Sequence, residues 1–335
     1  MPAASAGNIL FSKLVAFKEA TAGTIPTLTS GGRKLLVTPT GAITTGTTIE
    51  LGADRSVALR NPMIATTGVV VSTEPTVSAT VPAISVGELP IWLSMTKTVS
   101  ATGTATPYLW DYDYSMTTSN SPTTYTLVAT DGQQQYALNY TLAESITLAA
   151  DRSGLTSLSA NLFSQSIAKN SASLADTVPA SPFMAGRLWT AYQSGTVFPG
   201  TASGTALTYL LDFSLEFNAG ITKQAYLAGT TTFSTHAESG PFMGSLTMTV
   251  SSTSSAVSTW YDAYQAATPV GVRLNWTNGT QSVNVMAMIV PTEVQPMAGA
   301  EDGLTTYSVT GNLVYDPTSA KSLRIIVGSD LATLP

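Results

Sequence analysis

Cysteine is absent from the 335-residue chain, so neither a disulfide framework nor a cysteine-based metal site can form. This absence suits folding in a reducing cytoplasm. Charged residues are also scarce, since they make up 10% of the chain against roughly 25% in ordinary soluble proteins. A surface solvated mainly by hydroxyl groups repels other copies of itself only weakly, which favours extended self-association.

Basic residues are outnumbered by acidic ones, 14 against 20, which gives a net charge of −6. This balance argues against the usual cationic binding of nucleic acid, although such a surface can still face DNA without gripping it. Residues 1–11 lack the basic-then-apolar pattern of a secretion signal, and no uninterrupted apolar run reaches the roughly 18 residues of a membrane span. We therefore expect neither secretion by a recognisable route nor a membrane anchor.

Catalytic and metal-binding patterns are equally scarce. His236 is the one histidine, and no Gly-x-Ser-x-Gly motif surrounds Ser234 or Ser239. A solvated loop histidine is the favoured interpretation, and a hydrolase is the weakest functional one. Asp111 and Asp113 lack the ligand count of a calcium loop, so acidic caps of a turn are favoured there. The sequence predicts no enzyme, no catalytic residue, no bound metal and no cofactor.

The chain does contain an ordered repeat about 150 residues apart. Asp-Arg-Ser-Gly-Leu-Thr at 151–156 corresponds to Glu-Asp-Gly-Leu-Thr-Thr at 301–306, and an alternating strand ending in Asn-Leu follows each. Upstream, Asp131-Gly132 and Asn278-Gly279 are dipeptides typical of type I′ hairpin turns. The repeat predicts two copies of one domain.

Earlier elements follow the same order in both halves. The alternating segment 77–81 precedes Trp92 as 246–250 precedes Trp260. Helices are predicted around both tryptophans, at 89–95 with a proline in its first turn and at 254–267 with a serine cap. Period-two alternation predicts hairpins at 125–142 and 272–287 and a strand at 207–217.

These elements give a mainly β fold class with two tandem β-sandwich or barrel domains, each with one short flanking α-helix. We predict a first domain at 1–165, with an N-terminal arm and a long inserted loop at 97–123. Residues 166–205, rich in Ser, Ala, Pro and Gly, are predicted as a linker. The second domain is predicted at 206–335.

The hairpin Tyr-Thr-Leu-Val-Ala-Thr-Asp-Gly-Gln-Gln-Gln-Tyr-Ala-Leu at 125–138, followed by the strands at 144–162, resembles the tail tube (major tail) proteins of long-tailed bacteriophages. Residues 206–327 repeat the order of elements. The resemblance implies a β-sandwich with a flanking helix, assembled into stacked rings around a channel for DNA. The duplicated domain departs from the usual single tube domain per chain.

The implied function is that of a structural virion protein of a siphophage, a passive conduit for DNA ejection. Its implied partners are copies of itself, the tape measure, tail terminator and distal tail proteins, and double-stranded DNA that passes through the lumen without specific binding. The negative net charge predicts a lumen wall that is net acidic or neutral and rich in hydroxyl groups. Two domains per chain favour a trimeric ring with pseudo-sixfold symmetry, and a hexamer is the alternative if the second domain lies outside. Synthesis and assembly in the host bacterial cytoplasm are expected.

A β-sandwich adhesin, or a carbohydrate- or receptor-binding protein, is the alternative function. For that reading, Trp260, Tyr261 and Tyr264 would form a sugar-stacking face, whereas an ordinary helix packed on a sheet is the favoured interpretation of the same residues.

The inserted loop at 97–123 is too long and too aromatic for a simple connection. We expect it to reach an adjacent ring, and the alternative is a loop that folds back on its own domain. Exposed apolar clusters mark contact surfaces. The predicted inter-ring contact residues are Tyr108, Leu109, Trp110, Tyr112 and Tyr114.

Overall fold

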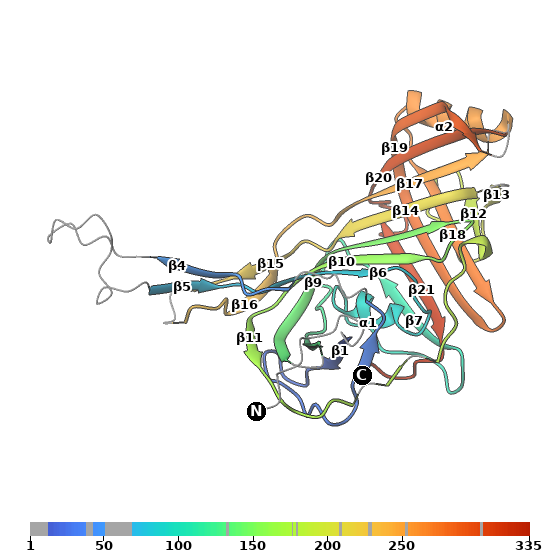
Figure 1. Ribbon diagram of the computed structural model, residues 1–335. Coiled ribbons are helices and arrows are strands. Elements are labelled where there is room, and N and C mark those ends of the chain that lie inside the picture. Colours follow the sequence, from blue (N-terminus) through green and yellow to red (C-terminus); the bar gives the residue numbers. More distant parts are fainter. Residues whose placement is uncertain are drawn as a thin grey trace, which may run out of the picture.

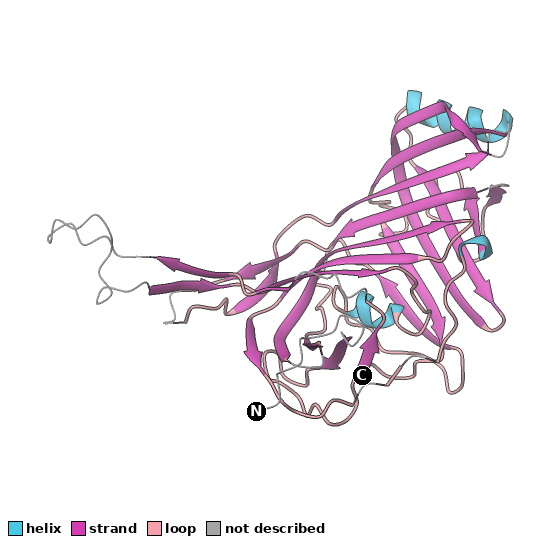
Figure 2. Ribbon diagram, in the orientation of Figure 1, coloured by secondary structure: helices cyan, strands magenta, loops and turns pink. Residues whose placement is uncertain are grey.

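The computed structural model describes residues 13–37, 43–50, 69–131 and 134–335, apart from residues 176, 179, 208–209, 227–229, 252–253 and 302–303. Antiparallel strands dominate this part of the chain, which also holds two α-helices and a 3-10 turn, η4 (Gly186–Leu188) (Figure 2). The mainly β fold class is therefore confirmed. Neither of the described helices has the length and apolarity needed to cross a bilayer.

The elements form two series with the same order, and a single strand, β7 (Tyr108–Asp113), has no counterpart. The first series is β1 (Lys13–Lys18), β2 (Arg33–Leu35), β3 (Ile43–Thr44), β4 (Thr47–Glu50), β5 (Val69–Thr73), β6 (Thr76–Val81), α1 (Leu89–Ser94), β8 (Tyr125–Thr130), β9 (Gln135–Asp151), β10 (Ser157–Phe163) and β11 (Ser166–Lys169). The second series is β12 (Trp189–Gln193), β13 (Thr205–Leu207), β14 (Leu210–Asn218), β15 (Ile221–Gln224), β16 (Thr235–Glu238), β17 (Met243–Ser251), α2 (Ser254–Gln265), β18 (Val270–Asn278), β19 (Gln281–Glu301), β20 (Leu304–Leu313) and β21 (Leu323–Ser329).

The strand pairings repeat together with the order. Each pairing within the first series has a counterpart in the second, for example β1–β8 with β12–β18, β6–β10 with β17–β20, and β9–β11 with β19–β21. We call the two series the first and the second repeat. Residues 166–205, predicted as a linker, contain β11 and β12, which pair with β9 and β18. The predicted domain boundaries stay a prediction.

A sheet of eight strands runs through both repeats in the order β3-β6-β10-β9-β14-β17-β20-β19. Two smaller sheets lie on one side of this large sheet (Figure 1). They are β2-β1-β8-β9-β11 in the first repeat and β13-β12-β18-β19-β21-β7 in the second. Within one chain the described strands do not close into a barrel.

The long strands β9 and β19 each belong to two sheets. The N-terminal part of β9 pairs with β8 and β11, and its C-terminal part pairs with β10 and β14. Strand β19 does the same with β18 and β21 and then with β20. Such corner strands hold two sheets face to face around a shared core. One hydrophobic cluster accordingly contains residues of both repeats.

The two helices occupy corresponding places before β8 and β18, and Trp92 and Trp260 on them are both fully buried. The turn after β18 differs by one residue from the prediction. Asn278 still pairs with Gln281, so the loop is Gly279–Thr280. Of these two loop residues only Gly279 has a positive φ, +63°, which suits a type II′ turn rather than type I′. Gly132 lies outside the described residues.

Glu88 is fully buried at the N-terminal end of α1. Its Oε1 accepts hydrogen bonds from Trp92 Nε1 at 3.1 Å and from the Leu36 backbone N–H at 3.0 Å. Burial raises the pKa of Glu88 to about 7, against the opposing effects of these two hydrogen bonds and of the nearby Arg33 charge. Glu88 Oε1 thus ties the segment after β2 to α1, and burial keeps the carboxyl protonated below about pH 7.

We expect the chain to lose stability as the pH rises from about 5 to 8, because the folded state holds a proton that the unfolded state has released. The shift corresponds to about 3 kcal/mol of unfolding free energy. Glu88→Gln should remove most of this pH dependence and be more stable than the natural chain at pH 8. Urea unfolding of the monomer at both pH values measures this, with Glu293→Gln as the exposed control. An unchanged pH dependence in Glu88→Gln would contradict the assignment.

Candidate assembly surface

One face of the eight-strand sheet points away from the hydrophobic core and carries short polar side chains. Alternation places every second residue there, as in β6, where Thr76, Ser78 and Thr80 are exposed and the residues between them are buried. Further members on the other strands are Ser145, Thr147, Asp151, Ser157, Ser159, Asn161, Asp212, Ser214, Glu216, Asn218, Ser245, Thr247, Thr249, Ser308, Thr310, Asn312, Glu293 and Gln295. We call this surface the polar face.

The charges of the polar face are all of one sign. Within the eight described strand ranges there is no Lys, Arg or His, whereas Asp151, Asp212, Glu216 and Glu293 supply carboxylates. Asp212 lies directly opposite Asp151. Hydrogen bonds from Ser153 lower the pKa of Asp151, so this carboxylate is ionised at neutral pH. The face therefore presents hydroxyl groups and negative charge to whatever lies in front of it.

Two basic residues instead form ion pairs at the smaller sheet of the second repeat. Arg324 on β21 makes a two-pronged ion pair with Asp111 on β7, through Nε at 2.8 Å and Nη2 at 2.6 Å. Lys321 pairs with Asp113 at 2.5 Å. The two aspartates are thus strand residues paired across repeats, and not the turn caps expected from the sequence.

The junction between the repeats is an ordinary antiparallel strand pair. Strands β9 and β14 match over seven residue pairs, from Asp212 opposite Asp151 to Asn218 opposite Ser145. Leu215 and Leu148 face each other near its middle, and both are buried in the core. The polar face consequently continues from one repeat into the other without a break.

Both ends of this sheet are open among the described strands. At one end, β3 pairs with β6 only, and at the other, the C-terminal half of β19 pairs with β20 only. By the repeat, β3 corresponds to β14 and β19 corresponds to β9, which are the two strands that pair at the internal junction. The chain thus carries one unused copy of each strand of its own junction.

Apolar side chains are exposed at both open ends of this sheet. Ile43 lies opposite Val77 in the way that Leu215 lies opposite Leu246, and it is 36% exposed. Met297 is 86% exposed, in a stretch where three residues of β19 bulge out of register with β20 between Gln295 and Gly299. Bulges of this kind protect free sheet edges from indiscriminate pairing. The sequence patterns had predicted no contact for Ile43 or Met297.

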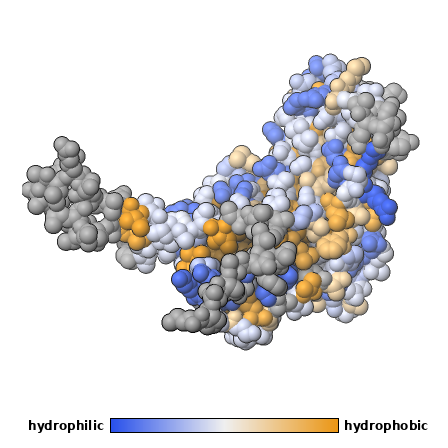
Figure 3. Space-filling view, in the orientation of Figure 1, coloured by the Kyte–Doolittle hydropathy of each residue, from blue (hydrophilic) through white to orange (hydrophobic). Residues whose placement is uncertain are grey.

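Two hairpins form an arm that projects from the body (Figure 1). Strands β15 and β16 pair near its base, and β4 and β5 form a separate two-stranded sheet. Figure 3 shows a hydrophobic patch on the arm, and its exposed members are Ile49, Val69, Val70 and Val71. An isolated two-stranded hairpin is at best marginally stable in water, so exposed aliphatic residues on it indicate a contact surface.

The β15–β16 hairpin packs on the first repeat. Ile221 and Phe233 join Tyr140 and Phe163 in a separate hydrophobic cluster. Phe233 meets both rings edge-on, with centroids 5.4 Å from Tyr140 and 5.7 Å from Phe163. Lys223 reaches Glu74 at 2.8 Å from the same hairpin. The second repeat therefore packs against the first through its β15–β16 hairpin.

Four of the five predicted inter-ring residues lie on β7, which pairs with β21 of the same chain, and Tyr114 directly follows it. Trp110, Tyr112 and Tyr114 are buried in the core, where Trp110 Nε1 donates to the Leu331 carbonyl at 2.9 Å and Tyr112 Oη donates to the Pro90 carbonyl at 2.8 Å. Leu109 is 44% exposed, and Tyr108 is half-buried. Their contact with another ring stays a prediction. Of the five residues, only Leu109 and Tyr108 reach the surface of the chain.

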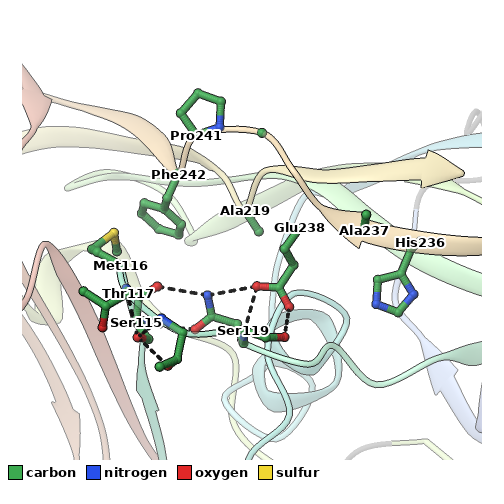
Figure 4. Close-up of a pocket in the computed structure, with 13 residues that line it drawn as sticks. Ser115, Met116, Thr117, Ser119, Ala219, His236, Ala237, Glu238, Pro241 and Phe242 are labelled. Carbon is green, nitrogen blue, oxygen red and sulfur yellow. Dashed lines mark hydrogen bonds between the residues drawn. The ribbon is translucent and has the colours of Figure 1, made fainter.

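A cavity of about 620 Å³ lies between residues 115–120 and the segment that joins β16 to β17 (Figure 4). Glu238 accepts hydrogen bonds there from the backbone N–H groups of Asn120 and Ser121 and from the Ser119 hydroxyl, at 2.6–2.8 Å. Partial burial works against these bonds, but together they keep the pKa of Glu238 below its ordinary value. Because the carboxylate is already satisfied, it fastens the arm to the insertion rather than waiting for a ligand.

His236 lies in β16 and not in a solvated loop as predicted. Its Nδ1 is 2.9 Å from Tyr140 Oη, and burial lowers its pKa. Ser239 Oγ is hydrogen-bonded to Thr222 Oγ1 instead. Among the described residues no three His, Asp or Glu side chains gather as metal ligands. The histidine contributes to the packing of the arm base.

A family model described as phage tail tube protein matches residues 12–312 of the chain. This range includes the polar face, both open ends of the eight-strand sheet, the arm and β7. No individual curated protein matches the sequence.

Proposed function

The chain belongs to the phage tail tube protein family, and from this premise we propose that its copies close into rings that stack into a tube. The family makes it a structural component of the virion that associates with itself and with other tail proteins. Our proposal specifies which strands close the ring and how many chains the ring contains.

The strand pair β9–β14 inside the chain is the observation that supports this ring. Strand β9 pairs with β14 inside the chain, and their counterparts β19 and β3 are left open at the two ends of the same sheet. Pairing β19 of one copy with β3 of the next repeats that junction between chains. In this register Thr44 lies opposite Gln295, because their counterparts Glu216 and Thr147 are opposite each other.

Three chains then complete a ring. Each contributes two repeats, so the ring has six corresponding positions and a continuous wall made of three eight-strand sheets. The mass is three times 34.8 kDa, about 104 kDa. Purified protein should give open tubes of constant width in negative stain and a ring of this mass after mild dissociation. A ring of twice this mass would contradict closure by three chains.

The polar face becomes the wall of the channel. Hydroxyl groups and carboxylates without basic residues give the phosphates of double-stranded DNA nothing to bind, so DNA slides past during ejection. Such a conduit fits a long-tailed phage of the siphophage type, assembled in the host cytoplasm together with tape measure, tail terminator and distal tail proteins.

Lysines on the polar face should convert the conduit into a DNA binder. In Ser214→Lys/Glu216→Lys, tubes are expected to retain a short duplex at 50 mM salt and to release most of it at about 200 mM, because each phosphate contact steepens the salt dependence. Co-sedimentation of labelled duplex with tubes measures this. Thr277→Lys, on the exposed part of β18, is the control and should retain none. Equal retention by natural tubes would contradict free passage.

Stacking of rings involves surfaces left exposed on the outside of the sheet. We propose the exposed side of β7 for one such contact, where Leu109 projects and Tyr108 is half-buried. Leu109→Asp should then give rings that form but do not stack. Long tubes of this variant, seen by negative stain, would remove β7 from the stacking contact.

A further inference from the structure

The apolar side of the β4–β5 hairpin has no cover within the described part of its own chain. Ile49 lies opposite Val70 in the ladder, so the two side chains share a face, and they are 57% and 38% exposed. Glu50 is the one charged residue in the described ranges of the two strands, so the surface suits an apolar partner rather than nucleic acid or solvent.

The second repeat shows how this hairpin packs when its neighbour is present. Ile221 in β15 follows Leu215 by six residues, just as Ile49 in β4 follows Ile43 by six. Ile221 is buried against Phe163 of the preceding repeat in the same sheet. The repeat that would precede β4–β5 in this way belongs to another copy of the chain.

The surface on that copy is identified by the same correspondence. The strand pairings place Thr76 opposite Phe163 and Ser245 opposite Asn312, so Asn312 takes the place of Phe163. Two residues further on, Val314 takes the place of Gln165, whose Nε2 donates to the Phe233 carbonyl of the β15–β16 hairpin. Glu74, two residues before Thr76 on β6, corresponds to Met243, two before Ser245 on β17. Met243 is 58% exposed, its neighbour on this surface Tyr315 is 42% exposed, and Val314 is half-buried. The surface that receives β15–β16 in the first repeat therefore has a counterpart in the second repeat that includes Met243, Val314 and Tyr315, and no described hairpin of the same chain covers it.

We propose that the β4–β5 hairpin of each chain docks on the surface formed by Met243, Val314 and Tyr315 of the neighbouring copy, as a clasp across the junction between chains. The inference rests on the proposed ring, because it needs the second repeat of one copy beside the first repeat of the next. Its partner is a second copy of this chain. The contact continues the layer begun by β15–β16, since the Thr73 backbone N–H donates to the Thr231 carbonyl where the two hairpins meet.

The clasp makes closure stronger than pairing of β3 alone. Strand β3 is two residues long where the structure describes it, whereas β14 spans nine. Burying Ile49 and Val70 on each junction supplies contact area that such a short edge lacks. We therefore expect Ile49→Asp/Val70→Asp to raise the concentration needed for assembly at least about 10-fold, with an unchanged circular dichroism spectrum of the monomer.

The absence of native cysteine allows a direct test by cross-linking. Two singly substituted chains, Ile49→Cys and Val314→Cys, are mixed under assembly conditions and treated with a short bismaleimide. A cross-linked dimer containing one chain of each kind is expected. The control mixture of Ile49→Cys with Tyr264→Cys, whose residue lies on the exposed side of α2, should give no such product.

A second pair separates the clasp from the ring itself. Thr44→Cys and Gln295→Cys lie opposite each other in the proposed edge pairing and should form a disulfide between chains. If this disulfide forms and the Ile49–Val314 link does not, the clasp is wrong and the ring stands. If neither product forms and the protein stays monomeric at every concentration, both proposals fail.

Discussion

Replacing Ile43 by aspartate is expected to abolish tube formation and to leave a folded monomer. In the free chain Ile43 is partly exposed, so the substitution costs the monomer little. In the proposed ring it takes the place of Leu215, which is fully buried at the internal junction. A buried carboxylate without a partner costs at least about 3 kcal/mol per junction, which weakens association ~100-fold or more. Sedimentation at concentrations where the natural chain forms tubes measures the loss.

The matched control is Ile25→Asp. Ile25 lies between β1 and β2 and is about as exposed as Ile43, but it is not on either open edge of the eight-strand sheet. This variant should form tubes at the concentration of the natural chain. Tubes formed equally well by Ile43→Asp would mean that β3 is not a joining strand.

Truncating Trp110 to alanine is expected to cost the monomer about 3–5 kcal/mol of unfolding free energy. The indole is buried between the repeats, and its N–H bonds the Leu331 carbonyl, so the substitution leaves both a cavity and an unpaired acceptor. Strand β7 also brings Asp111 and Asp113 to Arg324 and Lys321 of the second repeat. Urea unfolding measures the loss.

Leu109→Ala, one residue away on the exposed side of β7, is the control and should cost less than about 1 kcal/mol. Comparable losses from both substitutions would mean that β7 is not integrated into the core in the way the structure describes. A loss confined to Trp110 would leave the exposed side of β7 available for contacts between rings.

The sequence was most informative where local patterns are strong. Alternation and turn residues around Asp131 and Asn278 predicted the hairpins that became β8–β9 and β18–β19. Pro90 and the segment that begins at Ser254 located both helices. These signals arise from backbone geometry within a few residues, which is why they can be read without knowing the partner strands.

Pairings between distant segments could not be derived in this way. Nothing local to β7 says that it lies beside β21, although the buried alternation of Trp110, Tyr112 and Tyr114 is a strand signal. The junction of β9 with β14 likewise depends on the packing of whole repeats. The polar face could have been predicted from the sequence, because its strands have Ser or Thr at alternate positions and contain no Lys or Arg.

An electron cryomicroscopy reconstruction of tubes grown from the purified chain tests the central claim most directly. We predict three chains per ring, with β3 of each chain paired to β19 of the next and with the polar faces of both repeats lining the channel. A ring of six chains, with the first repeats alone around the channel and the second repeats outside, would contradict it.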